Sequence, residues 1–281
     1  MPRVFFITGA SSGLGRAYAQ EVINRGDFVV ATARKIESLQ FSGTSAKNYL
    51  PVSLEITDRA NIVAALRAAV DTFGRIDVLV NNAGYGLVGI FEELTDDEIN
   101  REMAVNFFAT LDVTRAAIQL MRDQTPCGGV IQQITSITGQ CGFSMMSLYC
   151  ASKWAVEGFT ESIAQEVNPA WNIKFTCIEP GGFRTNFFNS ISLQESKTPA
   201  YAHLHPRETT KALEKAQRGD PSKGAKAMYE LGIMKDPPLR IVLGSDALEQ
   251  MLTKTEQYGI SLRKYEHISS STDADENEKW K

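Results

Sequence analysis

The sequence lacks long apolar runs, paired cysteines and a strong excess of charge of one sign. None of its apolar stretches approaches the roughly 20 residues that span a bilayer, so we expect no membrane span. The four cysteines form no Cys-x-x-Cys pair, and the chain begins on a strand-like run without a basic, apolar leader, so we expect a reducing, cytoplasmic setting. A formal charge of -4 is too small and of the wrong sign for a nucleic-acid surface. These absences favour small-molecule chemistry.

What the sequence does contain is a regular alternation of two kinds of segment. With 43% apolar and 22% charged residues among 281, the chain can bury a large core. Strand and helix patterns that alternate along a chain predict parallel strands joined by right-handed crossovers, with helices on both faces. The expected fold is therefore an α/β doubly wound parallel sheet. We expect strands at 4–8, 28–33, 50–54, 78–80, 130–135, 174–178 and 239–243, and helices at 15–25, 58–73, 96–122, 149–167, 247–263 and between 209 and 234.

Two segments interrupt this alternation. Residues 187–206 are rich in serine, proline and aromatics, and we expect a loop over the site there. Residues 269–281 have little to bury and are expected to form a disordered tail. We find no internal repeat, so residues 1–268 are expected to form one domain.

A glycine-rich turn follows the first expected strand and leads into the first expected helix. Its residues run Thr8-Gly9-Ala10-Ser11-Ser12-Gly13-Leu14-Gly15. Glycines let the backbone turn sharply and approach a pyrophosphate, and a helix N-terminus supplies free amides and a partial positive charge. An ordinary Gly-Ser turn is the alternative, but the position directly after the first strand favours a dinucleotide. The residues expected to bind it are Gly9, Ser11, Ser12, Gly13, Leu14 and Gly15.

The end of the second expected strand bears on which dinucleotide is bound. An acidic side chain there binds the ribose hydroxyls of NAD and repels the extra phosphate of NADP. Here Ala33 stands where the acid is expected, and Arg34 and Lys35 follow it. Arg34 can pair bidentately with a phosphate and Lys35 adds a second charge, so NADP(H) is favoured as the cofactor. The alternative is that both are solvated loop cations.

Ser136, Tyr149 and Lys153 have a spacing that can gather three functional groups. Positions i and i+4 of a helix share a face, so Tyr149 and Lys153 can act on one substrate atom while Ser136 reaches it from a neighbouring strand end. They would supply a proton donor, an ammonium that lowers the pKa of the donor, and a hydroxyl that orients a carbonyl. A Tyr–Lys pair alone is often structural, and Thr135 or Thr138 could take the place of Ser136.

Several motifs resemble those of the single-domain short-chain dehydrogenases/reductases and occur in the same order along the chain. The resemblance covers residues 4–243 and looks most like NADP-preferring ketone reductases, akin to the retinol and 17β-hydroxysteroid dehydrogenases. It implies a Rossmann fold. In this family twelve residues lie between the serine and the tyrosine of the active site, so the resemblance selects Ser136. Besides the glycine turn, the motifs are Asn81-Asn82-Ala83-Gly84, Val105-Asn106-Phe107, Ser136, Tyr149 with Lys153, Pro180-Gly181-Gly182-Phe183-Arg184-Thr185 and the closing segment 237–244.

The resemblance implies further site residues. Asn106 would position a water behind Lys153 that returns a proton from solvent, although an Asn can also simply bend its helix. Relatives usually have Asp where Glu55 stands, to bond the adenine amino group, and the Ile56 backbone can still serve there. Segments 96–122 and 149–167 would form the contact of a homodimer or homotetramer. The other implied cofactor contacts are Asn82, Ala83, Gly84, Tyr149, Lys153, Pro180, Gly182, Phe183 and Thr185.

The expected substrate pocket is aromatic and apolar, which favours a hydrophobic ketone or aldehyde, or the matching secondary alcohol. His203 and His205 lack the cysteine or carboxylate partners of a zinc site, so we expect no metal. The expected activity is hydride transfer between NADP(H) and such a substrate, with Tyr149 as the proton donor or acceptor. The pocket wall is expected to contain Tyr85, Leu87, Phe143, Phe183, Phe187 and Phe188.

Two other functions are compatible with parts of the sequence. A non-catalytic NADP-sensing protein on the same fold would not need the Ser–Tyr–Lys–Asn set, and here all four positions are filled. A nucleotide-sugar epimerase or dehydratase shares Tyr-x-x-x-Lys but has a different glycine spacing and a larger C-terminal substrate domain. Both are less favoured than an oxidoreductase.

Overall fold

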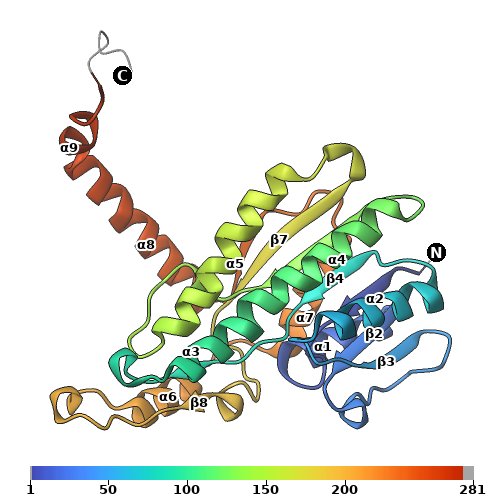
Figure 1. The fold of residues 1–281 in the computed structure, drawn as a ribbon, viewed down its shortest axis with the longest axis horizontal. Coiled ribbons are helices and arrows are strands. Elements are labelled where there is room, and N and C mark those ends of the chain that lie inside the picture. Colours follow the sequence, from blue (N-terminus) through green and yellow to red (C-terminus); the bar gives the residue numbers. More distant parts are fainter. Residues whose placement is uncertain (1, 275–281) are drawn as a thin grey trace.

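A computed structural model describes residues 2–274 of the chain. Seven parallel strands form one sheet in the order β3-β2-β1-β4-β6-β7-β9, so the strand order reverses between β1 and β4 (Figure 1). This reversal leaves a crevice at the carboxyl ends of the strands, where ligands bind in such sheets. The predicted doubly wound parallel sheet is confirmed. The strands are β1 (Val4–Ile7), β2 (Phe28–Ala33), β3 (Tyr49–Ser53), β4 (Val78–Asn81), β6 (Gly129–Ile134), β7 (Ile173–Pro180) and β9 (Arg240–Leu243).

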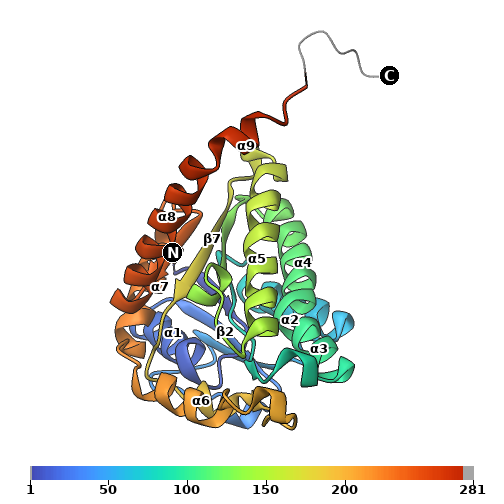
Figure 2. The same ribbon diagram turned by 90° about the vertical axis from the view of Figure 1, so that its left-hand side faces the viewer.

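Helices cover both faces of this sheet (Figure 2). On one face α1 (Gly13–Asn24) packs against α7 (Pro221–Ile233). On the other face lie α2 (Arg59–Phe73), α4 (Ala109–Asp123) and α5 (Ser147–Glu166). The helix α6 (Pro206–Lys215) lies near the carboxyl ends of the strands, while α8 (Ser245–Lys264) leads outward to the short α9 (Glu266–Ser270) (Figure 1).

The alternation of side chains along β1 explains why both faces need helices. Phe5 and Ile7 are fully buried in the core cluster that contains α1 and α7. Val4 and Phe6 point to the opposite face and are buried in the cluster that contains α2 and α4. Successive strand residues face opposite sides, so a strand with no polar position requires cover on both. The crevice at the carboxyl end of β1 therefore lies above a strand that is packed on both faces.

The single helix predicted over 96–122 is divided by a π-helical turn. It begins with α3 (Asp96–Met103), whose start is fixed by a capping box between Thr95 and Glu98. The π-helical turn Ala104–Phe108 follows and leads directly into α4. Single π turns within α-helices are frequent at functional sites. The residue at the centre of this turn is Asn106.

The segment 187–206, expected to be a loop, is anchored to the body of the protein. It contains a short strand, β8 (Ser192–Leu193), which pairs in parallel with β5 (Leu87–Val88). The carboxylate of Glu93 accepts hydrogen bonds from the backbone amides of Lys197 (2.9 Å) and Thr198 (2.7 Å). The prediction of an irregular loop is therefore only partly right, because two residues of strand and a carboxylate hold the segment in place.

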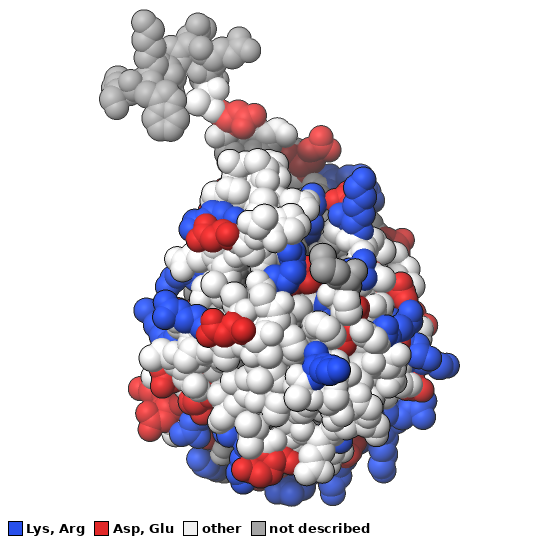
Figure 3. All heavy atoms as spheres, turned by 90° about the vertical axis from the view of Figure 1, so that its right-hand side faces the viewer, with Lys and Arg blue, Asp and Glu red and all other residues white. Residues whose placement is uncertain are grey.

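The remaining sequence-based expectations concern the chain end and the surface. The helix α9 includes Ser269 and Ser270, so the expected tail is not irregular from its first residue, and residues 275–281 lie outside the described part. Acidic and basic side chains are interspersed around a broad uncharged area on the face shown in Figure 3. Across residues 2–274, no helix is long and apolar enough to cross a membrane. The homo-oligomeric state stays a prediction.

Candidate active site

A cavity of about 780 Å³ lies at the carboxyl ends of the central strands, where the strand order reverses. Its wall brings together most of the residues predicted from the sequence, from six separate strand ends and from the start of α5. Three of the predicted catalytic and cofactor-binding residues do not lie on the wall, namely Gly15, Lys35 and Asn106. Those that do are Gly9, Ser11, Ser12, Gly13, Leu14, Arg34, Glu55, Ile56, Asn82, Ala83, Gly84, Ser136, Tyr149, Lys153, Pro180, Gly182, Phe183 and Thr185.

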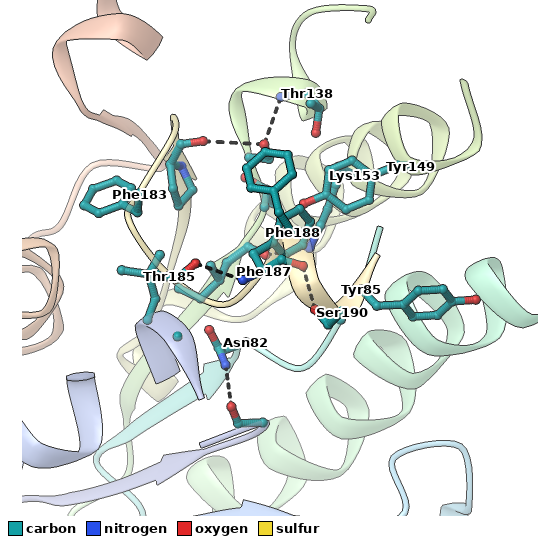
Figure 4. Close-up of a pocket in the computed structure, with 18 of the residues that line it drawn as sticks. Asn82, Tyr85, Thr138, Tyr149, Lys153, Phe183, Thr185, Phe187, Phe188 and Ser190 are labelled. Atoms are coloured by element: carbon teal, nitrogen blue, oxygen red, sulfur yellow. Dashed lines mark hydrogen bonds between the residues drawn. The ribbon is translucent and has the colours of Figure 1, made fainter. Parts of the chain in front are cut away.

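The glycine turn after β1 is tightly packed against the segment after β4. Gly9 has a φ of 65°, and a Cβ at this position would stand 2.9 Å from the Cα of Ala83. The side-chain amide of Asn82 donates to the carbonyls of Thr8 (2.9 Å) and Gly9 (3.1 Å). The Asn82 side chain, which the resemblance implied as a cofactor contact, therefore fixes the turn (Figure 4).

The N-terminus of α1 lies at the cavity, and no acidic side chain in its first turn balances the partial positive charge of the helix end. The N-cap residue Ser12 makes no side-chain capping bond, and the first turn contains no acidic residue. Free amides and the helix dipole at such an end favour an anion. Thr185 lies next to it, since its Cβ is 3.7 Å from the position of a Cβ on Gly13. The loop after β7 is thus brought against the N-terminal end of α1.

The part of the cavity next to β2 and β3 differs from the expectation at two residues. Arg34 lines the wall, is exposed and forms no ion pair with any described residue, so its guanidinium is available to an anion. Lys35 is exposed but does not line the wall, because the chain turns away into the short helical turn Ile36–Ser38. Glu55 lines the wall, yet its Oε1 accepts from the backbone amide (3.2 Å) and hydroxyl (2.9 Å) of Thr57. None of these three charged groups forms an ion pair with a described residue, and of the two cations only Arg34 lines the cavity.

Ser136, Tyr149 and Lys153 meet on the wall at the end of β6 and the start of α5. The Nζ of Lys153 lies 5.7 Å from the ring centroid of Tyr149 and donates to the carbonyl of Ile134 at 2.9 Å (Figure 4). Ser136 Oγ accepts from the amide of Thr138 at 3.1 Å. The predicted trio is therefore assembled on one cavity wall.

The two threonines considered in place of Ser136 have different surroundings. The hydroxyl of Thr135 lies 2.6 Å from Oε1 of Glu157, so it is committed to the interior. The hydroxyl of Thr138 is buried and has no hydrogen-bond partner among the described residues. Both Thr138 and Ser136 lie close enough to Tyr149 to lower its pKa. Both threonines line the cavity with Ser136, but the Thr135 hydroxyl is bonded to Glu157, whereas the Thr138 hydroxyl lies near Tyr149.

The charges at the site differ from the expectation that Lys153 lowers the pKa of Tyr149. Burial raises the pKa of Tyr149 well above its usual range, and the Glu102 carboxyl adds to this rise. Burial also lowers the pKa of Lys153 to about 8, against the opposing effects of Glu102 and Glu157. Burial is the largest effect on the pKa of Tyr149, so the expected net lowering is not found; the Lys153 ammonium donates to the Ile134 carbonyl. The phenol is thus held in its protonated form.

Asn106 lies one layer behind the cavity wall. Its side chain accepts from the backbone amide of Tyr85 (3.1 Å) and donates to the carbonyl of the same residue (2.8 Å). It also contacts Glu102 Oε1 (3.1 Å) and Ser152 Oγ (3.2 Å). A Cβ on Gly84 would lie 3.0 Å from Asn106 Oδ1 and 3.6 Å from Lys153 Nζ, so both groups lie against this glycine. Asn106 sits in a π turn, and its side chain bonds neighbouring segments rather than its own backbone.

The part of the cavity around Tyr149 is mainly apolar. The ring of Phe187 lies 5.7 Å from that of Tyr149, and Phe188 packs edge-on against Phe187 (Figure 4). Leu87, predicted to line the pocket, is instead buried within β5 and is not on the wall. Sequence reasoning missed several wall residues, among them Met146, Leu213, Arg101, Gln217 and Asp246, because nothing local indicated which helix faces the crevice.

The residues of the cavity fit a nicotinamide dinucleotide. Glycines permit close backbone approach, the α1 end offers amides to a pyrophosphate, and Arg34 offers an unpaired cation beyond it. The loop Pro180–Thr185 reaches the same wall, and Ser136 Oγ donates to the carbonyl of Pro180. Among the residues that the structure describes, no cluster of three potential metal ligands occurs. His205 instead precedes α6 as its N-cap residue.

Known proteins share this arrangement. A family model described as short chain dehydrogenase matches residues 3–196. The chain is 36% identical over 277 residues to the oxidoreductase calM of Penicillium decumbens, covering 94% of this chain and 90% of that protein. It is 34% identical over 250 residues to a 3-ketodihydrosphingosine reductase of Bacteroides thetaiotaomicron, covering 86% and 88%. A solved short-chain dehydrogenase from Streptomyces avermitilis superposes with a TM-score of 0.87 at 35% identity, covering 98% and 100%.

Proposed function

Because the chain belongs to the short-chain dehydrogenase/reductase family, we propose that it transfers a hydride between NADP(H) and a hydrophobic ketone, aldehyde or secondary alcohol. The observation that carries this proposal is the meeting of Ser136, Tyr149 and Lys153 on a wall shared with the glycine turn. When bound, the cofactor supplies or accepts the hydride. The protein supplies the proton and the binding site for the carbonyl oxygen.

In the direction of reduction, Tyr149 donates its phenolic proton to the carbonyl oxygen. A raised pKa keeps Tyr149 protonated at neutral pH, so the proton is in place when negative charge develops on the carbonyl oxygen and draws it away. The hydroxyl of Ser136 hydrogen-bonds the same oxygen and stabilises the negative charge that develops on it. Lys153 supplies a positive charge one helical turn away, which stabilises the phenolate that remains. In the direction of oxidation, the same groups remove a proton from the alcohol.

The wall around Tyr149 supports a hydrophobic substrate. Phe143, Met146, Phe187 and Leu213 line or pack against this end of the cavity. Pockets with an apolar wall and few polar groups bind apolar ligands and orient them through those groups. The relative named as a 3-ketodihydrosphingosine reductase supports a ketone as the reactive group.

The proposal is tested by assaying purified protein with NADPH and a panel of ketones that increase in apolar size. We expect oxidation of NADPH that depends on the ketone, with kcat/KM rising as the apolar part of the substrate grows. Binding of NADPH without turnover of any ketone or alcohol would instead support a cofactor-sensing protein. Failure to bind either dinucleotide would contradict both functions.

Replacement of Arg34 by Ala is expected to weaken NADPH binding and to leave NADH binding almost unchanged. Arg34 lines the cavity without an ion-pair partner among the described residues, so we expect its guanidinium to bind the extra phosphate. Loss of a charge-assisted hydrogen bond of about 1.5–3 kcal/mol corresponds to roughly a 10- to 100-fold rise in Kd for NADPH. Fluorescence titrations with both dinucleotides measure this effect.

Lys35→Ala provides the matched control, because Lys35 is the adjacent cation but does not line the cavity. It should raise the Kd for NADPH much less than Arg34→Ala does, and both variants should melt at nearly the wild-type temperature because both side chains are exposed. Equal weakening of NADPH and NADH in Arg34→Ala would contradict the phosphate contact. So would tight NADH binding by the wild type without a preference for NADPH.

A further inference from the structure

Asp246 is a partly buried acid in the first turn of α8, and it lines the cavity. Its Oδ2 accepts from the backbone amide of Gly182 at 2.7 Å, a length typical of a charge-assisted hydrogen bond. Its Oδ1 is buried without a hydrogen-bond partner among the described residues. Burial of a carboxylate oxygen without a partner costs free energy, and the bond to Gly182 is the contact that offsets this cost.

Three glycines leave room for this carboxylate. A Cβ on Gly181 would lie 2.5 Å from both carboxylate oxygens of Asp246, and a Cβ on Gly244 would lie 2.5 Å from Oδ1. A Cβ on Gly182 would lie 3.4 Å from Oδ2. The first and last of these glycines belong to the loop after β7, and Gly244 directly follows β9. The carboxylate packs this closely against the backbone only because Gly181 and Gly244 have no side chains.

The Gly182 peptide is held from two sides. Its carbonyl accepts from the backbone amides of Arg218 (3.0 Å) and Gly219 (2.8 Å), in the segment that precedes α7. Its own amide donates to Asp246, from the opposite element α8. One turn further along α8, the acid Glu249 also lines the cavity, but its carboxylate is paired with Arg218 at 3.6 Å. Asp246 is therefore the acid of α8 that binds the loop backbone.

The loop Pro180–Thr185 connects the two functional parts of the cavity. At its start, the carbonyl of Pro180 accepts from Ser136 Oγ at 3.4 Å. At its end, Thr185 lies against Gly13 at the N-terminus of α1. A dinucleotide that reaches from the α1 end to Ser136 must therefore pass along this loop, and its nicotinamide half would contact the loop backbone.

We propose that Asp246 is a positioning residue for the nicotinamide half of the cofactor: it fixes the Gly182 amide, and with it the loop that this half contacts. This inference rests on the proposed oxidoreductase function of the same site. The carboxylate is stabilised where it stands by the partial positive charge at the N-terminus of α8. It acts through the loop backbone, so the role is one of geometry.

The effect of Asp246 should be confined to one half of the cofactor. Arg34, which we expect to bind the extra phosphate of the adenosine half, follows β2. The loop held by Asp246 follows β7, and the strands β1, β4 and β6 lie between β2 and β7 in the sheet. A change in the position of Gly182 should therefore leave the surroundings of Arg34 as they are.

The test compares two ligands in the Asp246→Ala variant. NADPH occupies both halves of the site, whereas adenosine 2′,5′-bisphosphate lacks the nicotinamide. We expect the Kd for NADPH to rise about tenfold, since the variant loses a hydrogen bond to a charged acceptor. The Kd for adenosine 2′,5′-bisphosphate should be unchanged. Isothermal titration measures both constants. An unchanged Kd for NADPH, or an equal rise for both ligands, would contradict the proposal.

A double-variant cycle tests the contact independently of any single replacement. Gly181→Ala places a Cβ where the carboxylate stands, so it should displace Asp246 and produce the same selective rise in the Kd for NADPH. In the Asp246→Ala background the added Cβ no longer meets a carboxylate, so Gly181→Ala should add much less. Losses that simply add would show that the two residues act separately, and would contradict the proposal.

Further variants complete the experiment. Asp246→Asn keeps an oxygen that can accept from the Gly182 amide, so most of the affinity for NADPH should return. Glu256→Ala removes an exposed acid from the same helix and should match the wild type with both ligands. Thermal unfolding shows whether each variant is folded, and should Asp246→Ala fail to fold, Gly181→Ala carries the comparison of the two ligands.

The titrations also separate this inference from the proposed function. A wild type that binds NADPH but turns over no ketone or alcohol would contradict the proposed function alone, because the binding of the two ligands does not depend on turnover. Should the wild type bind NADH in place of NADPH, NADH and AMP form the corresponding pair of ligands, with the same selective loss expected in Asp246→Ala.

Discussion

Replacement of Tyr149 by Phe is expected to lower kcat for ketone reduction by about 1000-fold, within the 10²- to 10⁴-fold range typical of general acid catalysis. The variant loses only the hydroxyl that donates the proton. Its ring can still pack against Phe187, whose centroid lies 5.7 Å away. The Kd for NADPH and the Tm should therefore change little. Steady-state kinetics, fluorescence titration and thermal unfolding measure the three quantities.

Tyr85→Phe serves as the control for this variant. Tyr85 also lines the cavity, but its side chain points away from Tyr149 (Figure 4). Removal of its hydroxyl should change kcat by less than about threefold, because it is not placed to protonate the same oxygen. Turnover by Tyr149→Phe at the wild-type rate would remove Tyr149 as the proton donor. A parallel loss of NADPH binding would indicate a damaged site instead.

The features that could be predicted from the sequence are those set by local pattern. The spacing of Tyr149 and Lys153 within one helix fixes their common face, and both line the cavity as expected. The alternation of apolar runs located all seven strands of the sheet to within about two residues. The glycine turn was identified because only a few backbone conformations connect a strand so directly to a helix.

What could not be predicted depends on contacts between distant segments. Asn82 lines the cavity, but its hydrogen bond to the carbonyl of Thr8, 74 residues earlier in the chain, decides where its side chain points. The strand β8 exists only because β5 lies beside it. Glu102 follows several acidic residues in a helix that looks solvated, and its burial becomes visible only when α5 packs against α3. The charge pattern along α3 alone does not show that another helix covers one of its acidic residues.

Gly15→Ala is expected to have the second largest effect, although Gly15 does not line the cavity. A Cβ at this position would stand 2.3 Å from Nδ2 of Asn82 and 2.7 Å from the carbonyl oxygen of Gly9. The Asn82 amide cannot move freely, because it holds the carbonyls of Thr8 and Gly9. The turn must therefore shift as a whole, at a cost of about 1–3 kcal/mol for an overpacked site.

This shift should affect cofactor binding as well as stability. The displaced carbonyl of Gly9 belongs to the turn whose amides are expected to hold the pyrophosphate, so we expect the Kd for NADPH to rise by roughly 100-fold. Isothermal titration and thermal unfolding measure both effects. Gly158→Ala is the matched control, because a Cβ there meets nothing within 4 Å inside α5. It should leave the Kd unchanged and raise stability by up to about 1 kcal/mol through helix propensity. Wild-type affinity in Gly15→Ala would mean that the turn can adjust without loss, and that Asn82 does not fix it.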